Sequence, residues 1–587
     1  MKSIITTLAV ALLVLLTACL NQTRNEKTVS VASSSETVKQ TVGHETPATV
    51  IVTENRRPDV GPDSSDGEAV FTGVLPKIGP YPSYPEAWRV QQYQYSVPMN
   101  PGAASNIALA ADLSSVGGAY MRQMYAPVEV DSEKYIHFDE NGIKVVSDDP
   151  VSTFSIDVDT ASYSNVRRML EREGRLPQKD AVKVEEMINY FSYDYPSPKS
   201  LEMPFSVITE IARSPWNPDK HLLQIGLKGY QSIPANRPAA NLVFLIDVSA
   251  SMMSNDKLPL VKRSLKLLVN QMDSQDQIAL VAYAGAAGLV LDSTPAAERG
   301  KIMRAIETLD AGGSTNGGEG IALAYSVATE HFINDGINRV IIASDGDMNV
   351  GTVDHEALKN LIERKRESGI ALTTLGFGAG NYNYALMEQL ADVGNGNAAY
   401  IDSIQEAQKV LVNEIQSTLL TIAKDVKIQV EFNPKLVAEY RLIGYENRIL
   451  NREDFRNDKV DAGDIGAGHT VTAFYEVSLV GSGDTLLPEL RYQSDETSQS
   501  SSDFENEIAF VKLRFKLPDA TSSEEFTQSV LTSSIVDSID KASPNMQFAA
   551  SVAGFGQILR GGRFTGQWRL NDVARLARAA KGIDHYG

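Results

Sequence analysis

The sequence predicts a multidomain α/β protein built around a doubly wound, mostly parallel Rossmann-like sheet that is inserted in a flanking β-sandwich. Between residues 241 and 420, short apolar runs alternate with amphipathic helical runs, which is typical of a parallel sheet covered by helices on both faces. Alternating strand patterns precede this segment at 205–227 and follow it at 426–515. Because strands lie on both flanks, we expect them to form one sandwich. A chain of 587 residues is also too long for a single ordinary core.

The same patterns divide the chain into seven segments. They are a lipoprotein signal peptide (1–18), a disordered tether (19–130), an N-terminal helical and strand segment (131–204), β strands of the flanking sandwich (205–240), the α/β domain (241–420), the β-sandwich (421–520), and a C-terminal linker with helices (521–587). The tether is rich in Ser, Thr, Val and Glu up to about Gly67. Its apolar pattern is too weak to offset the entropy of ordering.

The N-terminus indicates a lipid anchor. A mostly apolar run from Ile4 to Leu16 is too short for a membrane-spanning helix. The following Leu16-Thr17-Ala18-Cys19 resembles a bacterial lipobox, in which Cys19 becomes the lipidated first residue; an ordinary cleaved signal peptide and a helical anchor are the alternatives. Cys19 is the only cysteine, so no intramolecular disulfide can form. Because Leu20 follows, resemblance to lipoprotein sorting implies the cell envelope, at the outer membrane facing the periplasm.

Charge excludes one class of partner. The formal net charge is −20, whereas binding to nucleic acid needs clustered Lys and Arg against phosphates. The acidic surface instead favours cations.

Residues 241–251 carry the candidate site. Five apolar residues, Leu242 to Ile246, predict a strand buried on both faces, and it ends at Asp247. Ser249 and Ser251 follow, so a carboxylate and two hydroxyls lie at the carboxyl end of the strand, where open α/β sheets bind ligands. Hard oxygen donors suit Mg²⁺. Alone, the pattern also fits a polar strand-to-helix turn with a serine cap.

Two later residues strengthen this prediction. Asp345 ends a second buried strand, and Thr315 lies in a glycine-rich loop between the two strands. Two carboxylates at one sheet edge repel each other unless something such as a divalent cation offsets their charge. We therefore predict a metal site made of Asp247, Ser249, Ser251, Thr315 and Asp345.

Other polar residues receive weaker interpretations. Tyr283 and Asn316 are expected to line the same edge, and Asp347 is interpreted as a solvated loop residue rather than an outer-shell acid. The run Asp157-Val-Asp159-Thr-Ala-Ser162 looks like a second metal loop. Because no partner carboxylate pattern follows at matching spacing, we interpret it as a capped strand-to-helix turn.

The metal pattern resembles a known site. Asp247-Val-Ser249-Ala-Ser251, Thr315 and Asp345-Gly346 resemble the metal-ion-dependent adhesion site of von Willebrand factor A (VWA) domains, with matching spacing across roughly 241–420. The resemblance implies direct ligation by the three hydroxyls, with the two carboxylates often acting through water. It also implies Mg²⁺ or another divalent cation such as Mn²⁺ or Ca²⁺.

A closer resemblance covers the chain from about residue 130. The phrases STFSIDVDTASYSNVRR, NLVFLIDVSASM, YAGAAGLVL, GNGNAAYIDS and IGAGHTVTAFYE are similar to the YfbK-type lipoproteins of Gram-negative bacteria. Two departures are visible. Ala250 stands where Gly is usual, at a position without a ligating group, and relatives extend beyond Gly587, so a truncated C-terminal helix is expected.

Three functions follow from these patterns. The first is a metal-dependent module that binds a protein partner in the envelope through a partner carboxylate. The second is a structural scaffold for envelope assembly, and the third is a hydrolase using Ser249 or Ser251. A nucleophilic serine needs a base, usually His, but His331 and His355 lie on predicted helices rather than at strand ends. We therefore expect no catalysis. Oligomeric state is not predicted.

Overall fold

The computed structural model describes residues 132–200, 202–231, 237–348, 355–487 and 504–582. The predicted signal peptide, Cys19 and the tether lie outside the described residues. Among the described helices, none is long and apolar enough to span a membrane.

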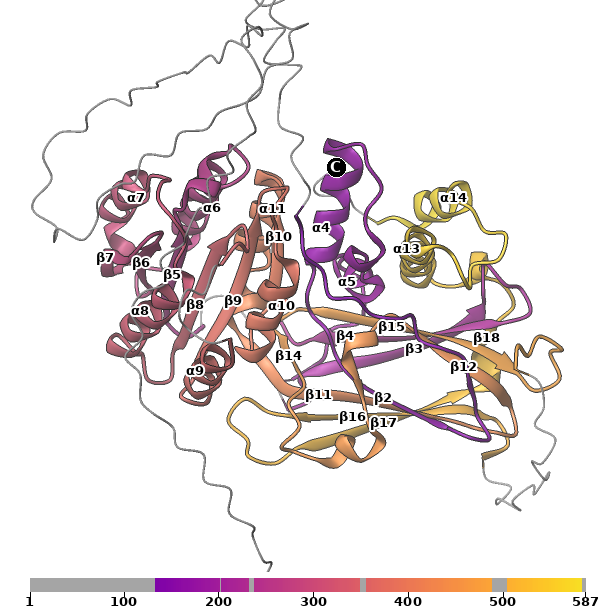
Figure 1. The fold of residues 1–587 in the computed structure, drawn as a ribbon. Helices are drawn as coiled ribbons and strands as arrows, with labels where there is room; N and C mark the ends of the chain where they lie inside the picture. Colours follow the sequence, from indigo (N-terminus) through magenta and orange to yellow (C-terminus); the bar gives the residue numbers. More distant parts are fainter. Residues whose placement is uncertain (1–131, 201, 232–236, 349–354, 488–503, 583–587) are drawn as a thin grey trace, which may run out of the picture. The chain divides into compact units, whose positions relative to one another are not determined.

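The centre of the described chain is a six-stranded sheet in the order β10-β9-β8-β5-β6-β7 (Figure 1). All neighbours pair in parallel except β6 and β7, which are antiparallel. The strands are β5 (Ala240–Asp247), β6 (Gln277–Tyr283), β7 (Ala287–Pro295), β8 (Ile337–Ser344), β9 (Ile370–Phe377) and β10 (Ala398–Ile401). Every residue of β5 is buried, as its apolar run predicts.

Helices cover both faces of this sheet, so the predicted doubly wound α/β class is confirmed. Phe244 and Ile246 of β5 pack in one apolar cluster, whereas Val243 and Leu245 pack in another on the opposite face. Alternation along a strand places neighbouring side chains on opposite faces. The first face is covered by α6 (Leu258–Gln271), α7 (Arg299–Thr308) and α11 (Ile404–Gln408), and the second by α8 (Gly317–Glu330), α9 (His355–Glu367) and α10 (Tyr384–Val393).

Strands from both flanks form the β-sandwich, with one core between two sheets. The first sheet has the order β1-β12-β15-β4-β3-β18 and the second β13-β2-β11-β16-β17, with β14 on β11. The ranges in the first sheet are β1 (Lys144–Val145), β3 (Phe205–Arg213), β4 (His221–Gly229), β12 (Val437–Ile443), β15 (Thr470–Leu479) and β18 (Ile535–Val536). Those in the second are β2 (Val151–Ser155), β11 (Thr421–Phe432), β13 (Ile449–Leu450), β14 (Gly463–Gly466), β16 (Glu507–Lys516) and β17 (Glu524–Leu531). Phe432 stacks on Tyr440 across the two sheets, with ring centroids 4.3 Å apart.

The sandwich is larger than its predicted boundaries. β1 and β2 come from the segment predicted as a separate N-terminal region, and β17 comes from the segment predicted as a linker. Long-range pairing decides these assignments: β2 lies between β11 and β13, and β17 pairs with β16. Such pairing leaves no signal in a short window of sequence.

Two helical segments are interrupted. The end of the central domain forms α11, a π-helical turn at Lys409–Asn413, and α12 (Ile415–Leu419). The C-terminal helical pattern forms α13 (Pro544–Arg560) and α14 (Leu570–Ala580). Gly561 and Gly562 follow α13 with φ of 122° and 68°, and such left-handed backbone ends a helix.

The N-terminal segment also contributes α4 (Ala161–Arg167) and α5 (Val184–Asn189). Val184 and Met187 of α5 pack with Met546 and Ala550 of α13 in a separate apolar cluster. This cluster covers the outer side of the first sandwich sheet, where Leu222 and Phe474 contribute to it.

Candidate metal site and a buried ionic junction

Three strands of the described chain end in the same local turn. Asp247 Oδ1 accepts a hydrogen bond from the Ser249 N–H at 2.9 Å, and Asp345 Oδ1 accepts one from the Asp347 N–H at 3.1 Å. Asp157 repeats this arrangement after β2, with the Asp159 N–H at 3.0 Å. Because β5 and β8 are adjacent and parallel, Asp247 and Asp345 lie at the same edge of the central sheet.

The predicted hydroxyl donors come to this edge from two segments. Ser249 Oγ lies 3.0 Å from Ser251 Oγ. The glycine-rich loop runs alongside, since the Ala250 N–H donates to the Gly313 carbonyl at 3.1 Å and the Gly312 N–H donates to the Val248 carbonyl at 2.7 Å. Thr315 is two residues beyond Gly313 and is half-buried. The structure thus brings the loop that carries Thr315 against the turn that carries the serines.

Asp247 is held by neutral hydroxyls. Its Oδ2 accepts hydrogen bonds from Tyr283 at 3.0 Å and from Ser344 at 2.9 Å. Burial raises the pKa of Asp247, with the charge of Asp345 adding to the effect and the hydrogen bonds from Ser249 and Ser344 opposing it. A buried carboxylate with only neutral donors favours a nearby positive charge.

The weaker predictions around this edge have different outcomes. Tyr283 is predicted to line the edge, but it is fully buried and instead donates a hydrogen bond to Asp247. Asn316 is half-buried at the start of α8. Asp347 is exposed, as expected for a solvated loop residue.

Sequence reasoning missed two residues that contact Asp345. Lys257 Nζ lies 3.1 Å from Asp345 Oδ2, and Asn381 Nδ2 donates to the same oxygen at 2.9 Å. Asn381 follows the end of β9, so strand-end reasoning could have found it. Lys257 precedes α6 and carries no comparable signal in the sequence.

The donor set fits a hard divalent cation. All five predicted residues offer oxygen, and the two carboxylates at the edge are fully buried. Ser249, Ser251 and Thr315 would hold the ion with Asp247 and Asp345 beside them. Bound there by neutral hydroxyls, such an ion would retain Lewis acidity toward a further oxygen ligand.

A second acidic cluster lies where three parts of the described chain meet. Asp157, Asp159 and Glu186 of the N-terminal segment have ligand oxygens within 4.8 Å of one another, and all three are buried. Asp159 Oδ1 accepts the Ala398 N–H at 2.7 Å, and Glu186 accepts the Ser162 N–H at 2.9 Å. Asp157 does form a strand-end turn, but α4 begins after Thr160 without a side-chain cap, so the interpretation as a capped turn holds only in part. Glu186 is the partner carboxylate that the spacing in the sequence did not reveal.

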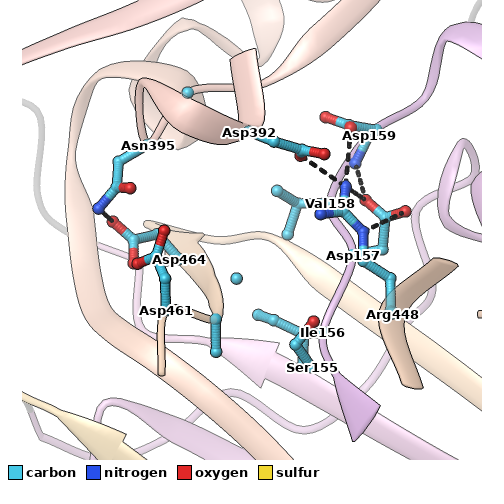
Figure 2. A pocket seen from close by; sticks show the side chains of 13 residues that line it. Ser155, Ile156, Asp157, Val158, Asp159, Asp392, Asn395, Arg448, Asp461 and Asp464 are labelled. Atoms are coloured by element: carbon cyan, nitrogen blue, oxygen red, sulfur yellow. Dashed lines mark hydrogen bonds and ion pairs between the residues drawn. The ribbon is translucent and has the colours of Figure 1, made fainter. Parts of the chain in front are cut away.

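Arg448 connects this cluster to the sandwich and to the central domain. Its guanidinium lies 2.7 Å from Asp392 of α10 and 3.2 Å from Asp159, and its Nε lies 3.3 Å from Asp157 Oδ2 (Figure 2). These side chains line one side of a cavity of about 100 Å³, with Asp461 and Asp464 on the other. We call the group around Arg448 the ionic junction. It consists of Asp157, Asp159, Lys183, Glu185, Glu186, Glu388, Asp392, Glu446 and Arg448.

Lys183 is the second cation of the ionic junction, but acids outnumber bases there. Lys183 pairs with Glu388 and lies 3.4 Å from Glu186. Glu185 is fully buried, and neither of its carboxyl oxygens has a hydrogen-bond partner among the described residues. Burial and the nearby charge of Glu446 raise the pKa of Glu185 to about 8. Burial likewise raises the pKa of Glu186 to about 7 and that of Asp392 to about 6.

The fold and the strand-end site together define a protein with a von Willebrand factor type A domain. The family model described as von Willebrand factor type A domain matches residues 241–417, and one described as von Willebrand factor matches 129–224. A third, described as "Uncharacterized protein YfbK, C-terminal", matches residues 417–587. The chain belongs to the YfbK family. It is 45% identical over 460 residues to YfbK of Escherichia coli K12, covering 77% of this chain and 79% of that protein.

More distant likenesses cover smaller shares of the chain. The chain is 27% identical over 202 residues to mouse inter alpha-trypsin inhibitor heavy chain 4, covering 32% of this chain and 21% of that one. Among solved structures, the von Willebrand factor type A protein from Catenulispora acidiphila shares 16% identity with a TM-score of 0.37, over 66% of this chain and 88% of that chain. BatB from Bacteroides thetaiotaomicron shares 20% identity with a TM-score of 0.27, over 30% and 97%.

Proposed function

We propose that this protein is an envelope lipoprotein whose VWA domain binds a protein partner through a divalent cation. The cation would be held by Asp247, Ser249, Ser251, Thr315 and Asp345, and a carboxylate of the partner would complete its coordination. The observation that carries the proposal is the pairing of two serine hydroxyls, 3.0 Å apart, with a fully buried carboxylate at a sheet edge. Membership in a family of VWA-domain proteins supports a role in protein–protein interaction.

Residues of this chain position the groups that would receive a carboxylate of the partner at this edge. Tyr283 and Ser344 hydrogen-bond to Oδ2 of Asp247, and the hydroxyls of Ser249 and Ser251 lie beside this carboxylate in contact with each other. Ser251 and Thr315 are half-buried, so a partner side chain can reach them. Specificity would come from the surface around the edge rather than from a deep pocket.

Serine hydrolysis is the weaker candidate. Among the described residues, no histidine hydrogen-bonds Ser249 or Ser251, whereas an activated serine needs a base within hydrogen-bond reach. His331 instead contacts Asp292 at 3.0 Å, and burial lowers the pKa of His469 to about 4. We therefore propose a binding protein rather than an enzyme.

The metal part of the proposal is tested with Mn²⁺, a paramagnetic probe for hard oxygen sites. We expect the full chain, purified in detergent, to remove free Mn²⁺ from the electron paramagnetic resonance spectrum. Asp247→Ala should lower the affinity at least about 100-fold, because one of two anionic ligands is lost. Asp310→Ala removes an exposed carboxylate from the same domain and should leave the affinity unchanged. Equal binding by both variants would refute the site.

The partner is tested by capture from envelope extracts. Wild-type chain with Mg²⁺ should recover proteins that are lost with chelator and with Asp247→Ala. Recovery of the same proteins under all three conditions would favour the scaffold function, in which the cation makes no contact with the partner.

The lipid anchor is tested by metabolic labelling with palmitate. We expect labelled full-length chain to fractionate with the outer membrane, and Cys19→Ala to lose the label. A label that persists in Cys19→Ala would contradict the lipobox assignment.

A further inference from the structure

Lys257 is fixed beside the candidate metal site by contacts along its whole length. Its side chain is only 8% exposed, and its Nζ donates to Asn381 Oδ1 at 2.7 Å as well as to Asp345 Oδ2 at 3.1 Å. Asn381 donates to that same oxygen of Asp345, so the three side chains form a closed triangle. The ammonium therefore has a defined position next to a predicted metal-binding carboxylate.

Glycine at 378 provides the space for the lysine stem. Gly378 has φ of +77°, and a Cβ there would lie 2.3 Å from Cγ and Cε of Lys257. The Gly378 carbonyl accepts a hydrogen bond from Tyr400 at 2.8 Å, which anchors this loop to β10. A side chain at position 378 would displace the stem, so the loop and the lysine fit each other.

Hydrogen bonds from the first described residues of the chain also hold this loop. The Ser132 N–H donates to the Gly380 carbonyl at 2.8 Å, and the Lys134 N–H donates to the Tyr382 carbonyl at 3.0 Å. The Gly380 N–H donates to Glu133 at 3.0 Å. With both sides of Asn381 held in this way, the side chain that positions Lys257 is itself positioned.

We propose that Lys257 is a built-in counter-cation that lowers the affinity of the site for a free divalent cation and so makes tight metal binding depend on a partner carboxylate. This inference rests on the proposed function. Asp247 and Asp345 together carry two negative charges, and the fixed ammonium reduces the local net charge to about −1. An incoming divalent cation is repelled by that ammonium and shares Asp345 with it. A carboxylate from the partner restores the lost negative charge.

Thermodynamic linkage makes the effect reciprocal. If a carboxylate raises the affinity for the metal by some factor, the metal raises the affinity for the carboxylate by the same factor. A site with a weak intrinsic hold on the metal stays mostly empty at a low metal concentration until the second ligand adds this factor. Lys257 thereby acts as a positioning and specificity residue, because it favours a metal–carboxylate pair over the metal alone.

If Lys257 has a purely structural role, its removal is expected to change the metal affinity in the opposite direction. If Lys257 only stabilised the fold around Asp345, its removal would loosen the site and weaken metal binding. If it is a counter-cation, its removal strengthens metal binding. Gain of affinity is a result that damage to the fold does not produce.

The experiment measures Mn²⁺ affinity by electron paramagnetic resonance on the full chain in detergent, with and without acetate as the probe carboxylate. Lys257→Gln should bind Mn²⁺ at least about tenfold more tightly than wild type without acetate. At a Mn²⁺ concentration where wild type is mostly empty, acetate should therefore raise the bound fraction less in the variant than in wild type. Lys266→Gln removes a more exposed charge from α6, the helix that Lys257 precedes, and is the matched control, with no change expected.

The outcomes distinguish a failure of the counter-cation proposal from a failure of the proposed function. Unchanged or weaker Mn²⁺ binding in Lys257→Gln, with wild-type binding still abolished by Asp247→Ala, overturns the counter-cation and leaves the metal site intact. Absence of Mn²⁺ binding in wild type and all variants overturns the proposed function itself. If Lys257→Gln does not fold, Lys257→Met retains the stem against Gly378 and must give the same increase in affinity.

Discussion

The candidate metal site and the ionic junction begin with nearly the same turn but differ in what surrounds them. After β5 and after β2, an aspartate accepts the N–H two residues on, at 2.9 Å and 3.0 Å. At the candidate metal site the aspartate of β5 is followed by serines. The negative charge of Asp247 and Asp345 is partly balanced there by Lys257. At the ionic junction the charge is balanced by Arg448 from the sandwich and by Lys183, which lies in the N-terminal segment close to Glu186. The two clusters thus share the turn and differ in the charged groups that surround it.

The location of each cluster fits this difference. The metal site keeps half-buried hydroxyls at a sheet edge, where a ligand can enter. The ionic junction lies between the N-terminal segment, the VWA domain and the sandwich, and its carboxylates are used to join them. We therefore expect substitutions at the junction to change stability, and substitutions at the metal site to change binding.

The largest effect on stability is expected from Arg448→Met. Arg448 is only 14% exposed, and its loss leaves Asp157, Asp159 and Asp392 without their shared partner. Breaking a buried ion pair by removing one side costs about 3–5 kcal/mol. Urea unfolding followed by circular dichroism measures this loss. Arg456→Met, at a side chain that is 82% exposed, is the control and should change stability by less than about 0.5 kcal/mol. Equal stability of both variants would contradict the structural role of the ionic junction.

An intermediate effect is expected from pH, through Glu185. Its pKa is raised to about 8 in the folded chain by burial and by Glu446, so the folded state holds a proton that the unfolded state releases above its ordinary pKa of about 4.5. The stability that this proton supplies is complete below the unfolded pKa and is lost as pH rises through the folded pKa. Between pH 6.5 and 8.5 the free energy of unfolding should fall by about 1–2 kcal/mol on this account.

Glu185→Gln provides the matched control for that titration. Glutamine keeps the shape of the side chain but cannot ionise, so the fall between pH 6.5 and 8.5 should be smaller than in wild type by about 1–2 kcal/mol. His469, whose folded pKa is lowered to about 4, affects stability below about pH 6.5 and does not disturb this window. Parallel pH profiles for the two proteins would show that Glu185 is not protonated in the folded chain.

The smallest effect on stability is expected from Ser249→Ala at the metal site. Ser249 Oγ contacts Ser251, which is half-buried and can bond to water instead, so the loss should be below about 1 kcal/mol. Mn²⁺ affinity should nevertheless fall about tenfold or more, because a neutral ligand is removed. Arg448→Met should show the reverse, with large destabilisation and unchanged Mn²⁺ affinity at a temperature where it remains folded.

The sequence by itself determined the central domain and predicted which residues form the candidate site. The apolar runs that end at Asp247 and Asp345 require buried strands, because only burial on both faces favours uninterrupted apolar residues. Parallel strands put their carboxyl ends on one edge, and this places the two aspartates together without further information. The alternating patterns on both flanks likewise predicted a sandwich with an inserted α/β domain, and this prediction is confirmed.

The tertiary structure alone decided what balances the charges. Lys257 meets Asp345 across 88 residues, and Arg448 meets Asp157 across 291, so neither pairing leaves a local pattern. The same reason explains why β2 and β17 were not assigned to the sandwich, since a strand acquires its sheet only from its partners. Carboxylates of like sequence thus lie at a sheet edge beside one lysine in one place and in an internal junction in the other, because a buried charge is stabilised by whichever opposite charge the fold brings within reach.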